Sequence, residues 1–128
     1  MKQYELSDFM RDFPDEKSAY DYVLAVKDPP FKVWRRPRGN AFTDRKGQYY
    51  NPLSGTIFNG SRLPLDKKFF AVFLIHYSPY MSFNELSRRL DITFQTAMKI
   101  KRKIAPLVDR RKGFIKQLRE LVKGDRIE

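Results

Sequence analysis

Glutamine, lysine and arginine side chains recur at helical spacing near residue 100 of the chain. At about 100° per residue, a helix through this segment places Gln95, Lys99 and Arg102 on one face. Glutamine can pair with adenine through two hydrogen bonds, and lysine or arginine can reach the edge of guanine. The spacing therefore predicts a surface able to distinguish bases in the major groove of DNA.

Three further side chains flank this face, namely Thr96, Met98 and Lys103. Threonine and methionine suit the methyl group of thymine, and lysine suits a guanine edge or a phosphate. Lys101 lies nearer the apolar side of the helix, so we expect it to extend along the surface toward a phosphate. The alternative is that the whole face is a charged surface exposed only to water.

The elements that position this face form a helix-turn-helix over Phe83–Arg102. The apolar residues that would hold the two helices together recur at suitable positions, namely Leu86, Leu90, Ile92, Ala97 and Ile100. Ser87 is small enough for a close helix crossing. Asp91 occupies the turn and tolerates a left-handed conformation, and the Thr93 hydroxyl can cap the second helix. A plain helical hairpin is the alternative.

The distribution of charge also favours a polyanionic partner. The chain of 128 residues has a net charge of +11 and a pI near 10.0. Residues 1–28 contain four basic and seven acidic side chains, a balance of −3, which leaves +14 on the remainder. The positive charge is concentrated in residues 32–46 and 99–112.

The two basic segments are expected to act differently. Arg110, Arg111 and Lys112 follow the groove helix, so we predict that they contact phosphates. In the middle segment Trp34 lies among arginines, which suggests stacking on bases or a minor-groove contact. Equally, Trp34 can pack in a small β-core. The predicted DNA-contacting residues are Thr93, Gln95, Thr96, Lys99, Arg102, Lys103, Arg110, Arg111, Lys112, Arg35, Arg36 and Arg38.

The composition argues against several other classes of protein. The chain has no cysteine and one histidine, so we expect no disulfide, no metal site and no cofactor. His76 is expected to be a core or boundary residue, and tyrosines 20, 22, 49 and 50 to pack. The longest apolar run, Phe69–Ile75, is too short to cross a bilayer, and no signal peptide is evident. We expect a cytoplasmic protein associated with the nucleoid.

The pattern predicts a mainly α fold of the α+β class, in which a small metal-free β-ribbon follows the first helix. Helices are expected over residues 15–27 and 65–77, and a final amphipathic helix closes at Gly124. Strands are expected at residues 31–34, 48–50 and 56–58. Ser82 and Glu85 suggest a capping box, and Pro106 should end or bend the groove helix. We divide the chain into residues 1–60 and residues 61–128.

The final helix has an apolar stripe that must be covered. Its members are Phe114, Ile115, Leu118, Leu121 and Val122. We expect the stripe to pack on the protein's own domain, with a homodimer or a protein partner as the alternative.

Several short stretches together resemble the N-terminal part of bacterial insertion-sequence transposases related to the eukaryotic Merlin elements. The matching pieces are Phe13-Pro14-Asp15-Glu16, Ser54-Gly55-Thr56-Ile57-Phe58, Leu63-Pro64-Leu65 with Phe69, Glu85-Leu86-Ser87-Arg88-Arg89-Leu90, Ile92-Thr93 and Thr96-Ala97. Their order and spacing agree over roughly residues 10–105. The resemblance implies a zinc ribbon and a helix-turn-helix ahead of a DDE-type catalytic domain.

The chain departs from that family in two respects. Arg36-Pro37-Arg38-Gly39 stands where the family has a Cys-Pro-x-Cys-Gly knuckle, and the second cysteine pair is also missing. The ribbon is thus expected to be held by aromatic packing of Phe31, Trp34, Phe42, Tyr49, Tyr50 and Phe58. The chain also ends before the family's catalytic carboxylates, so we expect no enzyme activity.

The leading hypothesis is a sequence-specific binder of double-stranded DNA, in the role of a transposase-derived transcriptional regulator. The alternative is an adaptor or inhibitor whose acidic N-terminal helix docks a protein partner, with DNA binding secondary. An enzyme has the least support, because the acidic side chains do not converge with a nucleophile or base.

Overall fold

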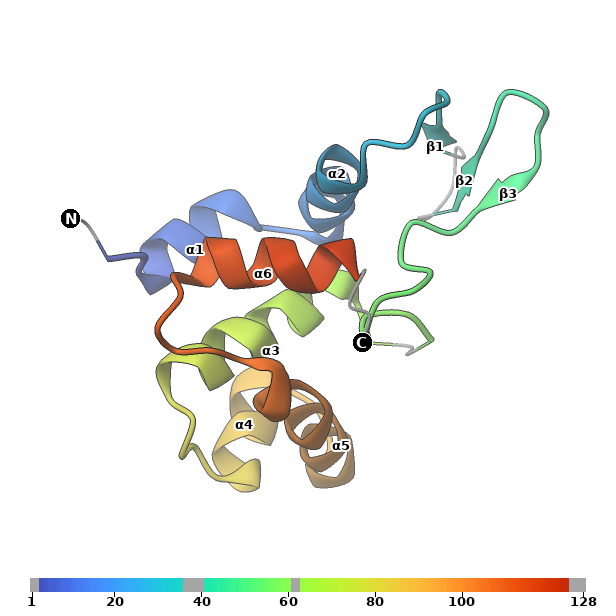
Figure 1. Cartoon of the computed structure of the whole chain (residues 1–128). Coiled ribbons are helices and arrows are strands. Elements are labelled where there is room, and N and C mark those ends of the chain that lie inside the picture. The colour runs from blue at the N-terminus through green and yellow to red at the C-terminus, as the bar shows by residue number, and fades with distance from the viewer. Residues whose placement is uncertain (1–2, 36–40, 61–62, 125–128) are drawn as a thin grey trace.

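The computed structural model describes residues 3–35, 41–60 and 63–124, and within them the chain is mainly helical with one small antiparallel sheet (Figure 1). The expected α+β class is therefore confirmed. The elements in chain order are α1 (Leu6–Asp12), α2 (Glu16–Lys27), β1 (Trp34–Arg35), β2 (Phe42–Thr43), β3 (Tyr49–Tyr50), α3 (Leu65–Tyr77), α4 (Phe83–Leu90), α5 (Phe94–Ile104), the 3₁₀ turn η1 (Ala105–Leu107) and α6 (Phe114–Lys123).

Helix α3 is the centre of the fold. Its burial is nearly complete, because Phe69, Ala71 and Val72 have no exposed surface. It contacts α2, α4, α5 and α6. The bounds agree with the helix expected at residues 65–77, and its apolar character on all sides has the expected cause, which is burial.

Aromatic rings fill the space between α3 and the N-terminal helices. Phe69 meets Phe13 and Phe58 edge to face, with ring centroids 5.2 Å apart in both pairs. Phe73 meets Phe114 of α6 in the same manner at 5.3 Å. Edge-to-face pairs of this kind add to the free energy gained from burial alone. The core draws its residues from both sides of residue 60.

Helix α1 was not predicted from the sequence. It spans less than two turns, and only Phe9 and Phe13 mark its apolar side, which is too short a pattern to reveal a helical period. The backbone N–H of Glu5 donates to Asp8 Oδ2 at 2.8 Å and helps to fix its start. As a result the β segment follows the second helix of the chain rather than the first.

Helix α2 begins and ends as its sequence indicates. Asp15 caps it by accepting a hydrogen bond from the Ser18 backbone N–H at 2.9 Å. The Glu16 carboxylate accepts from the backbone N–H of Leu65 at 2.9 Å and so joins the first turns of α2 and α3. Ala19 and Val23 are fully buried. The helix ends before Asp28, which is left-handed at φ 42°.

The sheet has two different faces. Its cross-strand register aligns Arg35, Phe42 and Tyr50 in one row, and Trp34, Thr43 and Tyr49 in the other. Because side chains alternate along a strand, the two rows point to opposite sides. Phe42 is buried against Tyr20 of α2, with ring centroids 5.6 Å apart, so the first row faces the helices.

Two of the aromatic residues expected to hold the ribbon together do not do so, because Trp34 is 43% exposed and Tyr49 is 69% exposed. Phe31 is also 43% exposed, but its ring packs edge to face on Tyr50, with ring centroids 5.5 Å apart, as expected. Strands of two residues offer only one inward position each, so half of the aromatic side chains must point outward. Phe42 and Phe58 are buried as expected, and Tyr20, Tyr22 and Tyr50 are partly buried.

The strand expected at residues 56–58 is wrong, because this stretch forms turns. The Thr56 hydroxyl donates to the Leu53 carbonyl at 2.7 Å and accepts from the Phe58 N–H at 3.1 Å. These local bonds use backbone groups that a strand would need for its neighbour. Residues 36–39, which stand where the resembling family has its first cysteine pair, lie outside the described residues.

Helix α6 lies across the helical layer and packs on α2 and α3 (Figure 1). Phe114, Leu118 and Val122 have no exposed surface, so the main part of its apolar stripe is covered by the protein's own domain. Gly124 ends the helix in a left-handed conformation, at φ 63°. Ile115 differs from the rest of the stripe, because it is 37% exposed.

Within the described ranges, no helix has both the length and the apolar character needed to span a membrane.

The end of α6 gives a test of this packing. A Cβ atom added to Gly124 would lie 2.4 Å from the Gly55 carbonyl oxygen, which is backbone and cannot rotate away. Gly47, also left-handed at φ 80°, has open space around it. Gly47→Ala is expected to lower the free energy of unfolding by about 1–2 kcal/mol through backbone strain alone. Gly124→Ala should lower it further in urea unfolding followed by far-ultraviolet circular dichroism, and equal losses would contradict this packing.

Candidate nucleic-acid interface

Helices α4 and α5 form the expected helix-turn-helix. Asp91, between them, is left-handed at φ 57° and ψ 52°. The Ile92 N–H donates to the Ser87 carbonyl at 3.0 Å, which closes the turn. Aspartate adopts this conformation more readily than most residues other than glycine, so the departure from glycine is tolerated. The predicted turn is confirmed.

Side-chain caps fix where both helices begin. Ser82 Oγ accepts from the Glu85 N–H at 3.1 Å, and Thr93 Oγ1 accepts from the Thr96 N–H at 3.1 Å. The predicted cap of α5 is confirmed. The box expected at Ser82 is only half formed, because the Glu85 carboxylate bonds Arg89 at 2.9 Å and also Arg88.

The apolar side of α5 faces the core as expected. Ala97 and Ile104 are buried, and Ile100 is partly buried against the same cluster. Phe94 meets Phe83 of α4 edge to face at 5.7 Å. These contacts hold α5 from one side only.

The opposite side of α5 is exposed and rich in hydrogen-bonding groups. Gln95, Lys99, Arg102 and Lys103 are exposed, while Thr96 and Met98 are partly exposed. No ion pair involves these three cations in the part of the chain that the structure describes. The exposed Thr93 donates its hydroxyl hydrogen to Thr96 Oγ1 at 2.9 Å. The predicted groove face is thus brought together on one helix.

Lys101 does not reach outward to a phosphate position. Its Nζ donates to the Met81 carbonyl at 2.5 Å and lies 5.5 Å from the centroid of the Phe83 ring. The ammonium is therefore used to tie α5 to the segment before α4. This expectation is wrong because an acceptor from another part of the chain lies within reach, which helical spacing alone does not reveal.

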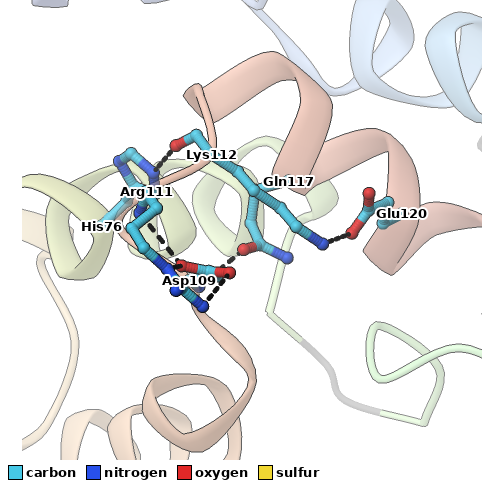
Figure 2. Close-up of polar contacts among 6 residues, drawn as sticks. All are labelled: His76, Asp109, Arg111, Lys112, Gln117 and Glu120. Carbon is cyan, nitrogen blue, oxygen red and sulfur yellow. Dashed lines mark hydrogen bonds and ion pairs between the residues drawn. The ribbon is translucent and has the colours of Figure 1, made fainter.

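The basic residues after α5 belong to a polar cluster that connects η1 to α6 (Figure 2). Arg111 Nε pairs with Asp109 Oδ1 at 3.2 Å, and Lys112 Nζ pairs with Glu120 Oε1 at 2.5 Å. Arg110, by contrast, is exposed and forms no ion pair with any described residue. Of the three predicted phosphate contacts, Arg110 is the one that has no carboxylate partner among the residues that the structure describes.

Two buried polar side chains complete this cluster. Gln117 Oε1 accepts from the Asp109 backbone N–H at 2.6 Å, and His76 Nε2 lies 2.7 Å from the Lys112 carbonyl oxygen (Figure 2). A carbonyl can only accept, so Nε2 of His76 carries the hydrogen. His76 is 4% exposed, which confirms it as a core residue. No local pattern in the sequence indicates the Lys112–Glu120 pair, because eight positions and a turn separate the two residues.

In the middle basic segment Arg35 faces inward. Its Nη2 lies 3.1 Å from Asp21 Oδ1, and its guanidinium lies over the Phe42 ring at 4.9 Å. Arg35 thus joins the sheet to α2, and its predicted contact with DNA gains no support from this position. Arg36 and Arg38 lie outside the described residues.

Trp34 lies on the outward row of the sheet, so the alternative in which it packs in a β-core is wrong. Lys32 Nζ lies 5.5 Å from the centroid of its ring, and the sheet leaves the indole 43% exposed. Arg45 and Lys46 are exposed at the turn between β2 and β3. The base-stacking hypothesis for this segment stays a prediction.

Comparison of the chain with protein-family models, curated proteins and solved structures gives no significant match.

The Asp109–Arg111 pair can be tested by titration. Hydrogen bonds from the Arg111 side chain and backbone hold the pKa of the Asp109 carboxyl below its ordinary value of 3.8. A carboxyl group whose pKa is lowered in the folded protein stabilises the folded state at pH values above its ordinary pKa. This contribution is lost as the pH falls through the folded-state pKa. Arg111→Gln should raise the Asp109 pKa toward 3.8 in a carboxyl-detected NMR titration. Arg110→Gln is the matched control, and an equal shift in both variants would contradict the pairing.

Proposed function

We propose that the protein is a sequence-specific binder of double-stranded DNA that inserts α5 into the major groove. The observation that carries the proposal is the exposed face of Gln95, Lys99 and Arg102 on a helix anchored from its opposite side. Cations that have no carboxylate partner among the described residues are available to an external anion. The net charge of +11 favours the same partner.

The dimensions of α5 suit a groove. A helix with its side chains is about 10–12 Å across, which matches the width of the major groove at about 12 Å, and the 11 residues of α5 extend for roughly 16 Å. The helix begins at a Thr93 cap that fixes its direction, and its first exposed turns carry Gln95 and Lys99. In this arrangement Gln95 and Lys99 contact base edges, while Arg102 and Lys103 contact a base or the backbone farther along. Thr93 and Thr96 lie at the end that enters the groove.

Arg110 is the best supported phosphate contact outside α5. It is exposed in the connection that follows η1, and neighbouring polar bonds hold that connection in place. A positioned arginine restrains a phosphate at a lower entropic cost than one on a mobile segment. Arg111 and Lys112 act chiefly as supports for Arg110 in this proposal.

The proposed biological role is transcriptional regulation by a nucleoid-associated cytoplasmic protein derived from a transposase. The motif pieces that resemble the Merlin-related group support the origin, since several of them occupy structurally specific positions. Thr56 organises a turn, Leu65 begins α3, and Thr93 caps α5. Binding, rather than catalysis, is the proposed activity.

A second candidate function is docking of a protein partner on the N-terminal helices. Leu6 and Met10 lie one turn apart on α1 and are 45% and 52% exposed. The acidic residues nearby offer less support, because Asp8 and Asp12 pair with Arg11 and Asp21 pairs with Lys17. Titration of random duplex DNA at several salt concentrations separates the two functions. A steep salt dependence supports the first, and absence of binding at low salt supports the second.

Base recognition by α5 is tested with variants at a site recovered by selection from a random duplex pool. Gln95→Ala or Lys99→Ala should each weaken binding to that site by about 1–3 kcal/mol and relax the preference at one position. Lys116→Ala, an exposed change on α6, should leave affinity nearly unchanged. Equal affinity for all sequences before and after the α5 changes would rule out base recognition by this face.

The role of Arg110 is tested by the salt dependence of binding. Loss of one phosphate contact should reduce the slope of log K against log salt by about 0.9. Arg110→Gln is expected to show this reduction, whereas Lys112→Gln removes an ammonium already paired with Glu120 and should change the slope less. An unchanged slope in Arg110→Gln would remove Arg110 from the interface.

A further inference from the structure

A pocket of about 220 Å³ lies between α5 and the turn segment that precedes α3. Apolar side chains form much of its wall, namely Ile57, Phe58, Ile100 and Ile104. Three lysines, Lys68, Lys99 and Lys103, also line it. The pocket thus combines an apolar interior with a concentration of positive charge.

No acidic side chain among the described residues lines this pocket. Lys68 is 7% exposed, and its Nζ donates to the Phe58 carbonyl. Burial lowers the pKa of Lys68 and the charge of Lys103 lowers it further, while Glu16 opposes the shift. An anion in the pocket would reduce the repulsion between these ammonium groups, because a nearby opposite charge favours their charged form.

The size of the pocket limits what it can hold. A buried apolar cavity of about 150 Å³ is large enough for benzene, whereas sites for drug-sized ligands occupy roughly 300–1,000 Å³. A single ring or a short branched chain with one charged group therefore fits inside it. The apolar part of the wall can contact the ring or chain of such a ligand, and the lysines can contact its charged group.

We propose that this pocket binds a small amphipathic carboxylate of about the size of benzoate. The carboxylate lies among the ammonium groups of Lys68, Lys99 and Lys103, and the apolar body packs against Ile57, Ile100 and Ile104. A neutral ligand of the same shape loses the ionic contacts, and a small inorganic anion loses the apolar ones. Both parts of the ligand are thus needed for full affinity.

The pocket shares Thr96, Lys99 and Lys103 with the surface proposed to contact DNA. A carboxylate bound to Lys99 and Lys103 would neutralise charge that otherwise attracts phosphates. On the proposed function, the ligand therefore weakens DNA binding and acts as an effector. The binding test below is carried out without DNA, so its failure is distinguishable from failure of the proposed function.

The first experiment compares benzoate, benzyl alcohol and inorganic phosphate by NMR titration of the full chain at constant ionic strength. Benzoate should shift the methyl signals of Ile57, Ile100 and Ile104 and bind at least about tenfold more tightly than the other two probes. Equal binding of benzyl alcohol would mean a simple apolar cavity, and equal binding of phosphate would mean a simple cation cluster. Either result, or shifts at other residues, overturns the proposal.

The second experiment separates the pocket from general surface charge. Lys103→Gln removes a cation that lines the pocket, and Arg102→Gln removes its exposed neighbour, which does not line it. Lys103→Gln should weaken benzoate binding about fivefold or more, while Arg102→Gln should leave it nearly unchanged. Both changes are at exposed positions, so thermal unfolding should confirm that the variants are folded. Equal effects of the two changes would overturn the proposal.

Discussion

Burial of α3 on nearly every side is the interaction on which the rest of the structure depends. Phe69 and Phe73 of this helix contact rings from the N-terminal segment and from α6, so distant parts of the chain meet around it. The helix-turn-helix packs on the same element. A strongly cationic surface repels itself and disfavours the compact state. The free energy gained by burying apolar side chains must offset that repulsion. This gain is largest around α3, where the side chains are fully buried.

The cations divide into two groups according to their partners. Arg89, Arg111 and Lys112 pair with carboxylates and help to fix helix ends and connections. Lys99, Arg102 and Lys103 form no ion pair with a described residue and cluster on α5. The net charge does not separate these two groups. The presence or absence of a carboxylate partner decides which side chains are available to an external anion. The pattern of ion pairs thus limits the candidate interface to fewer residues than the composition does.

The sequence predicts local features well because their causes are local. The bounds of α3, the left-handed Asp91 and the Thr93 cap follow from burial, turn chemistry and hydrogen bonding within a few residues. Helix α1 was missed because its apolar pattern is too short to show a period. Lys101 was misplaced because its acceptor, the Met81 carbonyl, lies 20 residues away along the chain. Contacts of this kind depend on how separate elements pack.

The outward row of the sheet has a practical consequence for spectroscopy. Trp34 is the chain's single tryptophan, and it lies on the side of the sheet away from α2. Its emission therefore reports on the sheet surface and on anything that covers it, rather than on the core around α3. Quenching by a small solute would measure access to that surface directly. A molecule that approaches this surface would therefore change the signal of the chain's one strong fluorophore while the core around α3 stays folded.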